Sequence, residues 1–135
     1  MKVFYKTRAT ATGGRSGTSA LDDGSLSLEM AQPGTGKAGA NPEQLFAMGY
    51  AACFDSAMSL VAKQMGLDAS GSQTAVEVGI GQSPAGGYML DLDIYISVPA
   101  LSEAEAQKLV EATHQVCPYS HATRGNIDVR LHVSN

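Results

Sequence analysis

The chain has 135 residues, of which 44% are hydrophobic, and a formal net charge of −4. Its length suits one domain over residues 1–135, and its acidic balance argues against a nucleic-acid surface. The first residues alternate charged and apolar side chains, unlike a secretory leader, and no apolar run reaches the roughly 20 residues of a membrane span. We therefore predict a cytoplasmic protein with no nucleic-acid or membrane partner. In a reducing compartment its two cysteines are not expected to form a structural disulfide.

The N-terminal third predicts three strands. Residues alternate over Val3–Thr12, and the stretches Thr18–Leu21 and Ser25–Met30 flank the turn Asp22–Gly24. These segments predict an antiparallel meander. The turn Gly13–Arg15 between the first two strands can direct a guanidinium outwards, although an isolated loop arginine is usually only solvated.

The longest apolar segment, Asn41–Gly66, predicts a helix. Asn41 is a favoured N-cap, Pro42 suits the first helical position and Gly66 supplies a stop. Apolar side chains occur on every side of this helix, so it must be buried on every side. A chain of this size would cover such a helix more easily by sharing its core with a second copy. A thiol at Cys53 in these surroundings would stay neutral and unreactive unless a cation is brought to it.

The C-terminal half predicts a hairpin, a helix and a last strand. Alternation over Thr74–Ile80 and Tyr88–Val98 indicates two paired strands with one buried face. Ser102 opens a helix through a Ser-x-x-Glu capping box, and this helix ends near Cys117. Ile127–Val133 alternates as the last strand. The order β-β-β-α-β-β-α-β indicates an α+β domain in which antiparallel sheets pack around helices.

The two cysteines allow three hypotheses from the residues alone. Both can be small core hydrophobes, which is the commonest state of a free cysteine. Alternatively Cys53 attacks a substrate and Cys117, beside a turn, resolves the product as a disulfide. A metal site is the third hypothesis, with ligands from His114, Cys117 and His121 and a fourth from Cys53 or His132.

Two long motifs resemble one protein family. The run Asn-Pro-Glu-Gln-Leu-Phe-Ala-Met-Gly-Tyr-Ala-Ala-Cys-Phe ends at Phe54, and Val-Cys-Pro-Tyr-Ser-His-Ala-Thr-Arg-Gly-Asn-Ile ends at Ile127. With the Thr-Gly-Gly-Arg loop that ends at Arg15, they resemble the organic hydroperoxide resistance (Ohr) proteins, a branch of the superfamily of osmotically induced protein C (OsmC). His121 departs from the family pattern, in which Asn is expected.

The resemblance implies a thiol peroxidase that reduces alkyl, aryl and fatty-acid hydroperoxides to alcohols. Cys53 would match the peroxidatic thiolate, Cys117 the resolving thiol, and Arg15 with Glu43 the polar pair that activates the site. The family further implies an intertwined, OsmC-like homodimer without a bound cofactor, metal or haem. A lipoyl dithiol such as dihydrolipoamide, carried by a lipoylated protein, would be its external reductant.

Helix geometry restricts how these residues can meet. Ten residues separate Glu43 from Cys53, which is roughly 15 Å along a continuous helix. Either the helix breaks, for example near Gly49, or the glutamate of each site comes from a second subunit. We favour the second explanation, because a two-fold interface makes such an exchange reciprocal.

An apolar lining for the substrate is also predicted around Cys53. Its candidate residues are Phe46, Met48, Tyr50, Phe54 and Tyr119. Apolar area would favour alkyl hydroperoxides over hydrogen peroxide. The alternative from another functional class is a non-enzymatic thiol and histidine module that binds a hydrophobic ligand or a metal at a dimer interface.

Overall fold

The computed structural model describes all 135 residues and has the α+β architecture that we expected. The backbone clusters into two compact units, Met1–Leu45 and Phe46–Asn135. Each unit contains one three-stranded sheet.

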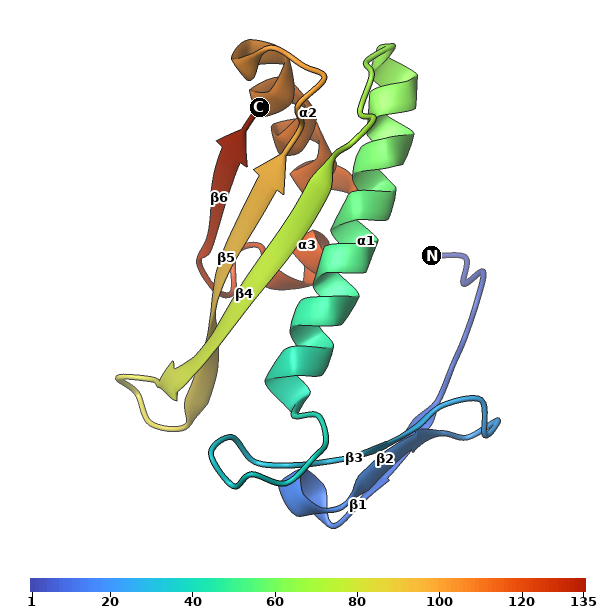
Figure 1. Cartoon of the computed structure of the whole chain (residues 1–135), viewed down its shortest axis with the longest axis vertical. Coiled ribbons are helices and arrows are strands. Elements are labelled where there is room, and N and C mark those ends of the chain that lie inside the picture. The colour runs from blue at the N-terminus through green and yellow to red at the C-terminus, as the bar shows by residue number, and fades with distance from the viewer. The chain divides into compact units, whose positions relative to one another are not determined.

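The N-terminal unit is the predicted antiparallel meander. Its strands β1 (Ala9–Thr12), β2 (Thr18–Leu21) and β3 (Ser27–Glu29) pair in chain order (Figure 1). The first strand is shorter than the predicted Val3–Thr12, because the four residues of β2 provide no partner for the residues before Ala9. A single 3₁₀ turn, η1 (Gly14–Ser16), joins β1 to β2.

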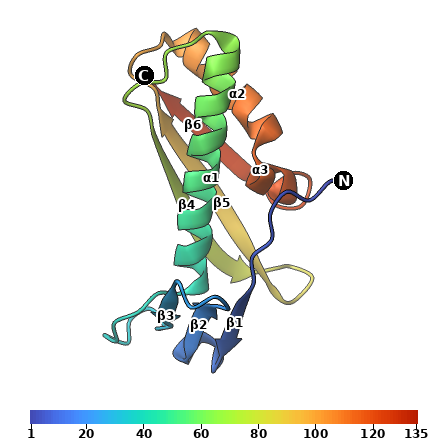
Figure 2. The same ribbon diagram turned by 90° about the vertical axis from the view of Figure 1, so that its right-hand side faces the viewer.

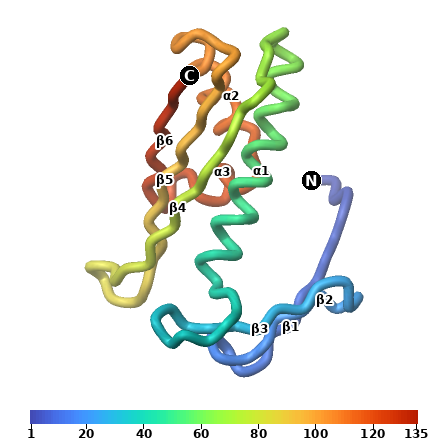
Figure 3. The backbone as a smooth tube through the Cα atoms, viewed as in Figure 1, coloured from blue at the N-terminus to red at the C-terminus, as the bar shows by residue number.

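The C-terminal unit contains a mixed sheet. Strands β4 (Gln73–Gln82) and β5 (Tyr88–Ser97) form the predicted hairpin. The last strand, β6 (Val129–Ser134), pairs with β5 in parallel, whereas we expected only antiparallel pairing. The two helices between β5 and β6 provide the long crossover connection that parallel pairing requires. The path of this connection can be followed along the tube in Figure 3.

The crossover consists of α2 (Glu103–Val116) and α3 (Pro118–Thr123). Helix α2 begins with the predicted capping box at Ser102. The sequence did not predict α3, because Pro118 indicated the end of a helix. Pro118 instead starts a second helix, in which a missing N–H costs nothing, and Cys117 is the residue that joins the two helices.

Helix α1 (Pro42–Met65) has the predicted start and stop. The Asn41 side chain accepts from the Gln44 backbone and the Gln44 side chain accepts from the Asn41 backbone, at 2.8 and 2.9 Å. Gly66 ends the helix at φ 68°. The helix is not buried on every side within one chain, since Met48 is 68% and Leu60 57% exposed.

The hydrophobic core belongs to the C-terminal unit. Helices α1, α2 and α3 lie on one face of the β4–β5–β6 sheet (Figures 1 and 2). The strand β5 presents Leu92, Ile94 and Ile96 to this core, and all three are fully or almost fully buried. From α1 the core contains Tyr50, Phe54, Met58, Val61 and Ala62.

The composition of α1 corrects one expectation from the sequence. This helix is long and apolar enough to cross a membrane by length and composition, with a mean hydropathy of 1.4 over its most apolar window. From the sequence we expected no stretch of the chain to be long and apolar enough to cross a membrane. The core helix of a soluble protein can meet it too, and α1 contributes one face to the core described above.

Candidate functional site

Arg15 and Glu43 form a two-point ion pair in the N-terminal unit. The guanidinium Nη1 and Nη2 atoms of Arg15 donate to Oε2 and Oε1 of Glu43 at 2.7 and 2.5 Å. Arg15 is presented by the η1 turn, and Glu43 lies in the first turn of α1. The turn depends on Gly13, at φ 78°, and on Gly17, where an added Cβ would lie 1.8 Å from the Thr12 carbonyl oxygen.

This pair keeps both groups charged. The hydrogen bonds from Arg15 lower the pKa of Glu43, and those to Glu43 raise the pKa of Arg15. Because the pKa of Glu43 is lowered, the ion pair persists at neutral pH and is lost only as the pH falls through that lowered value. The Arg15 side chain stays 42% exposed, so the guanidinium can contact a further anion.

The two cysteines lie together in the C-terminal unit. Cys53, in the middle of α1, is half-buried, and Cys117, between α2 and α3, is fully buried. Both are free thiols, and Cys117 lies close enough to Cys53 to raise the pKa of its thiol. The structure therefore brings together the two residues that the redox-pair hypothesis requires.

The surroundings of Cys53 within its own unit keep it protonated. Burial raises the pKa of its thiol above the ordinary value, and the neighbouring Cys117 raises it further. A backbone hydrogen bond from Tyr119 acts in the opposite direction but does not reverse the shift in pKa. A neutral thiol is a poor nucleophile, so this unit alone does not activate Cys53.

Three aromatic rings lie between α1 and α3 beside the thiols. Tyr119 makes aromatic contacts with Phe46 and Tyr50, at ring-centroid distances of 5.9 and 5.4 Å. Its ring passes over Gly49, where an added Cβ would lie only 2.6 Å from the Tyr119 hydroxyl. Gly49 thus makes room for Tyr119 one helical turn before Cys53.

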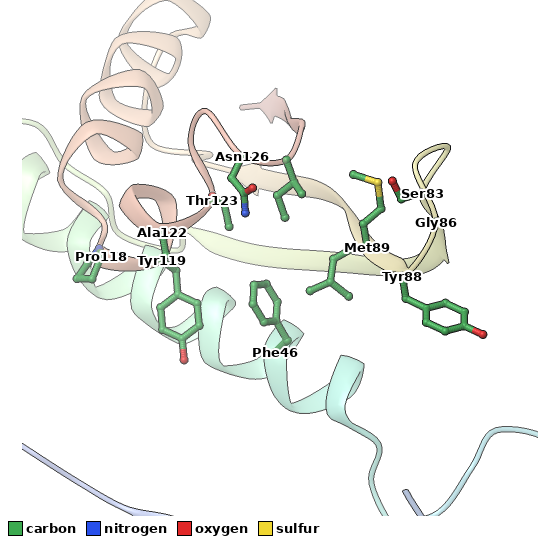
Figure 4. Close-up of a pocket in the computed structure, with 12 residues that line it drawn as sticks. Phe46, Ser83, Gly86, Tyr88, Met89, Pro118, Tyr119, Ala122, Thr123 and Asn126 are labelled. Atoms are coloured by element: carbon green, nitrogen blue, oxygen red, sulfur yellow. The ribbon is translucent and has the colours of Figure 1, made fainter. Parts of the chain in front are cut away.

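A pocket of about 740 Å³ opens beside these rings (Figure 4). Phe46 and Tyr119 face it, and the ring of Tyr88 is directed away from the other side chains. The remaining wall comes from the β4–β5 hairpin, from α3 and from the loop that follows α3. These residues are Ser83, Gly86, Met89, Leu90, Pro118, Ala122, Thr123, Asn126 and Ile127.

The predicted apolar lining is therefore placed in three different settings. Phe46 and Tyr119 line the pocket, Tyr50 and Phe54 are fully buried core residues, and Met48 is exposed. Tyr50 and Phe54 cannot contact a substrate there, because other core side chains surround them completely. The sequence did not indicate the contribution of the hairpin, whose only signal is the apolar run that ends at Leu90 after two glycines.

The metal hypothesis finds no matching arrangement of ligands. No three His, Cys, Asp or Glu side chains gather closely enough to hold a metal ion. His114 Nδ1 lies 2.8 Å from the Ser120 hydroxyl, and His132 Nε2 lies 2.7 Å from Asp93 on β5. These two histidines thus have partners outside the predicted ligand set.

Comparison with known proteins places this chain in a family. The OsmC-like protein family model matches residues 34–132. An organic hydroperoxide resistance protein of Xanthomonas axonopodis pv. citri is 51% identical over 96% of this chain and 94% of its own length.

Two solved structures share the fold closely. The organic hydroperoxide resistance protein of Elizabethkingia anophelis, with thiocyanate bound, has a TM-score of 0.90 at 49% identity, covering 100% of this chain and 99% of that one. OhrB of Bacillus subtilis has a TM-score of 0.91 at 39% identity, covering 97% and 99%. The chain therefore belongs to the OsmC-like family, in its organic hydroperoxide resistance branch.

Proposed function

We propose that this protein is a thiol peroxidase that reduces organic hydroperoxides to alcohols. The observation that carries the proposal is the proximity of two free thiols, Cys53 and Cys117, which is what a peroxidatic and a resolving thiol require. The names of the relatives, which refer to organic hydroperoxide resistance, support the substrate class.

The reaction has two steps on the protein. The Cys53 thiolate attacks one peroxide oxygen, an S–O bond forms, the O–O bond breaks, and the alkoxide takes up a proton and leaves as the alcohol. The Cys53 sulfenate takes up a proton from solvent, and the Cys117 thiol attacks its sulfur. An S–S bond forms, the S–O bond breaks, and the oxygen leaves as water with that proton and the thiol proton of Cys117. A dithiol of the lipoyl type returns two electrons and two protons by disulfide exchange, without a bound cofactor.

Activation of Cys53 requires a cation, and Arg15 is the candidate. Its guanidinium would stabilise the thiolate and the departing alkoxide, while Glu43 fixes its orientation. Helix α1 is unbroken between Glu43 and Cys53, which removes the explanation that relied on a break near Gly49. We therefore assign Arg15 and Glu43 of each site to the second subunit of a homodimer.

Exposed apolar surface supports this dimer. In one chain Met48 and Leu60 on α1 are more than half exposed, and so is Leu26 before β3. The N-terminal sheet also has an apolar hollow of about 140 Å³, whose lining includes Leu21, Leu28 and Leu45. A second copy that covers these surfaces would satisfy the burial that the composition of α1 demands.

The pocket lined by Phe46 and Tyr119 would hold the organic part of the substrate. Burying apolar surface contributes about 25 cal/mol per Å², and hydrogen peroxide has no such surface to offer. We therefore expect cumene, tert-butyl and fatty-acid hydroperoxides to react faster than hydrogen peroxide. Equal or greater efficiency with hydrogen peroxide would contradict the role of the pocket.

Rapid-mixing kinetics with cumene hydroperoxide test the enzyme against the non-enzymatic alternative. Cys53→Ser should abolish peroxide consumption, whereas Cys117→Ser should reduce one equivalent and then stall without another thiol. Full activity of Cys53→Ser would refute the role of Cys53, whereas a wild-type protein that consumes no hydroperoxide would favour a module that binds a hydrophobic ligand. Turnover with dihydrolipoamide compared with thioredoxin tests the proposed reductant.

Subunit mixing tests the origin of Arg15. Cys53→Ser and Arg15→Ala chains with different affinity tags are coexpressed, and the mixed dimer is purified through both tags. If each site combines two chains, the mixed dimer has one intact site and about half the wild-type activity. If Arg15 acts on the cysteine of its own chain, the mixed dimer stays as inactive as its two parents.

A further inference from the structure

A chain of buried hydroxyl groups joins the three helices around the cysteines. Tyr50 Oη on α1 lies 2.9 Å from Ser120 Oγ and 3.2 Å from Thr123 Oγ1, both on α3. The same Ser120 Oγ lies 2.8 Å from His114 Nδ1 on α2. Tyr50 and Ser120 are completely buried and Thr123 is 3% exposed, so water does not replace these hydrogen bonds.

Three members of this network lie three residues from a thiol in the sequence. Tyr50 precedes Cys53 by three residues, and His114 precedes Cys117 by three. Ser120 follows Cys117 by three residues, in the first turn of α3. Tyr50 and Cys53 share one face of α1, because residues three apart in a helix do so. Cys117 is extended and joins α2 to α3, so the network holds the helical turns on both sides of it.

Counting protons gives the network one direction. Thr123 Oγ1 donates to the Ser120 carbonyl oxygen at 3.2 Å, so the proton for its contact with Tyr50 comes from the tyrosine. Tyr50 then accepts from Ser120, and Ser120 accepts from His114 Nδ1–H. Each hydroxyl uses its single proton once, and no contact is left without a donor.

The opposite direction leaves one contact unsatisfied. If Ser120 donated to His114, Tyr50 would have to donate to Ser120, and no proton would remain for the contact between Tyr50 and Thr123. The count therefore assigns the neutral His114 ring a proton on Nδ1 rather than Nε2. Burial, followed by the charge of Arg124, lowers the pKa of His114, in agreement with a neutral ring.

We propose that this network, running from His114 through Ser120 and Tyr50 to Thr123, positions Cys117 for its attack on oxidised Cys53. The proposal rests on the peroxidase function proposed above. None of these four residues exchanges atoms with the substrate, so they are positioning residues. They act on the second step, because they fix the backbone on both sides of Cys117 and one turn of α1.

The position of Cys117 determines how long the Cys53 sulfenate survives before the disulfide forms. Until Cys117 attacks, the Cys53 sulfenate can react with a second hydroperoxide, gain another oxygen and become an irreversible sulfinic acid. A displacement of about 1 Å can slow such a step by up to 100-fold. Variants that loosen the network should therefore be inactivated sooner by excess hydroperoxide, although their first oxidation proceeds normally.

The test compares three variants that each remove one buried hydroxyl. Tyr50→Phe and Ser120→Ala interrupt the network, whereas Thr113→Val removes an equally buried hydroxyl that donates to the Leu109 carbonyl oxygen outside it. Mass spectrometry after rapid mixing with cumene hydroperoxide measures sulfenate, disulfide and sulfinate separately. We expect Tyr50→Phe and Ser120→Ala to form the sulfenate within about twofold of the wild-type rate and the disulfide about tenfold more slowly.

Several results would overturn the proposal. Normal disulfide formation in both network variants would do so, as would an equal slowing in Thr113→Val. A wild-type protein that forms no sulfenate would instead refute the peroxidase function itself.

The wild-type protein also gives a test that needs no variant. Nitrogen NMR of the His114 ring must show a proton on Nδ1, and an Nε2–H tautomer would overturn the proposed network. His114→Asn, which keeps a donor near the Nδ1 position, should restore the fast disulfide step that His114→Ala loses.

Discussion

The two units of the chain differ in both their cores and their chemistry. Every residue of the buried hydrophobic cluster belongs to the C-terminal unit, whereas only Met30, Ala31 and Asn41 are buried in the N-terminal unit. The C-terminal unit holds both thiols, and its surroundings raise the pKa of Cys53. The N-terminal unit holds a fixed and partly exposed guanidinium in Arg15.

By the proposed mechanism, neither unit has a complete site by itself. A thiol in an apolar core is positioned well but stays protonated. A guanidinium on a small sheet stays charged but has no nucleophile to activate. In the proposed dimer the N-terminal unit supplies the charge that the core around Cys53 lacks, and the C-terminal unit supplies the nucleophile that the N-terminal unit lacks.

The largest expected effect concerns the cores. Phe54→Ala should lower the free energy of unfolding by about 3–5 kcal/mol, because Phe54 is completely buried in the C-terminal unit. Leu26→Ala in the N-terminal unit should cost about 1 kcal/mol or less, because this residue is 52% exposed in one chain. Urea unfolding at several protein concentrations measures both costs.

The dependence on protein concentration should also differ between Phe54→Ala and Leu26→Ala. The cost of Phe54→Ala should persist at every concentration, whereas that of Leu26→Ala should appear only where the protein is dimeric. A cost for Leu26→Ala that is independent of concentration would mean that the N-terminal unit buries this residue without a second copy.

The next effect concerns the charge on Cys53. In wild-type protein Arg15 should make Cys53 a thiolate near neutral pH, whereas in Arg15→Ala the thiolate should form about 1–3 pH units higher. The direction follows because a cation stabilises the anion, so that its removal leaves burial and Cys117 to raise the pKa. The rate of iodoacetamide alkylation as a function of pH measures this change.

Arg8→Ala is the control within the same unit. Arg8 is an 84% exposed arginine that pairs with Asp22, and it has no proposed contact with a thiol. Its alkylation profile should match that of the wild type. An unchanged profile in Arg15→Ala would refute the assignment of Arg15 as the activating cation.

Local signals in the sequence predicted most of the fold. The caps at Asn41 and Ser102 are confirmed, because capping depends on residues three positions apart in the sequence. The parallel pairing of β6 and the helix that starts at Pro118 were missed. The parallel pairing results from the path of the crossover in space, which leaves no periodic pattern in the sequence. The helix was missed because proline can either end one helix or start the next.

The candidate site could be predicted only in part. The motifs around Cys53 and Cys117 carried the resemblance to the family, and Glu43 pairs with Arg15 across 28 residues of sequence. The pocket wall from the β4–β5 hairpin was missed, as was the network around Ser120. Single hydroxyl groups in different helices carry no spacing signal, and only the fold brings them together.

A smaller effect is expected at Gly49, where the aromatic cluster meets α1. In Gly49→Ala the new Cβ would lie 2.6 Å from the Tyr119 hydroxyl, so the ring must move. The gain of about 1 kcal/mol in helix propensity opposes the strain, and we expect a net loss of stability of about 1 kcal/mol. Cumene hydroperoxide reduction should slow more than hydrogen peroxide reduction, because Tyr119 lines the pocket.

A double-mutant cycle checks the cause of that loss. Tyr119→Phe removes the atom closest to the new Cβ, so Gly49→Ala should cost less in that background than in the wild type. Equal costs in the two backgrounds would assign the effect to α1 itself rather than to the contact with Tyr119.

The smallest effect is expected for Arg130, which binds a carboxylate through two nitrogen atoms as Arg15 does. Arg130 on β6 binds Asp91 and Asp93 of β5, with shortest distances of 2.8 and 2.5 Å, on the face of the sheet opposite the helices. Its hydrogen bonds lower the pKa of both aspartates, so the pairs stabilise the fold at neutral pH and are lost as the pH falls through those lowered values. Arg130→Ala should lower the thermal midpoint of unfolding slightly at neutral pH, and the difference from wild type should narrow in acid and in high salt.

The peroxidase activity and the alkylation profile of Cys53 should not change in Arg130→Ala, because this guanidinium faces no thiol. If Arg130→Ala reduced activity as much as Arg15→Ala, the total charge of the protein, rather than the position of one guanidinium, would control the thiolate.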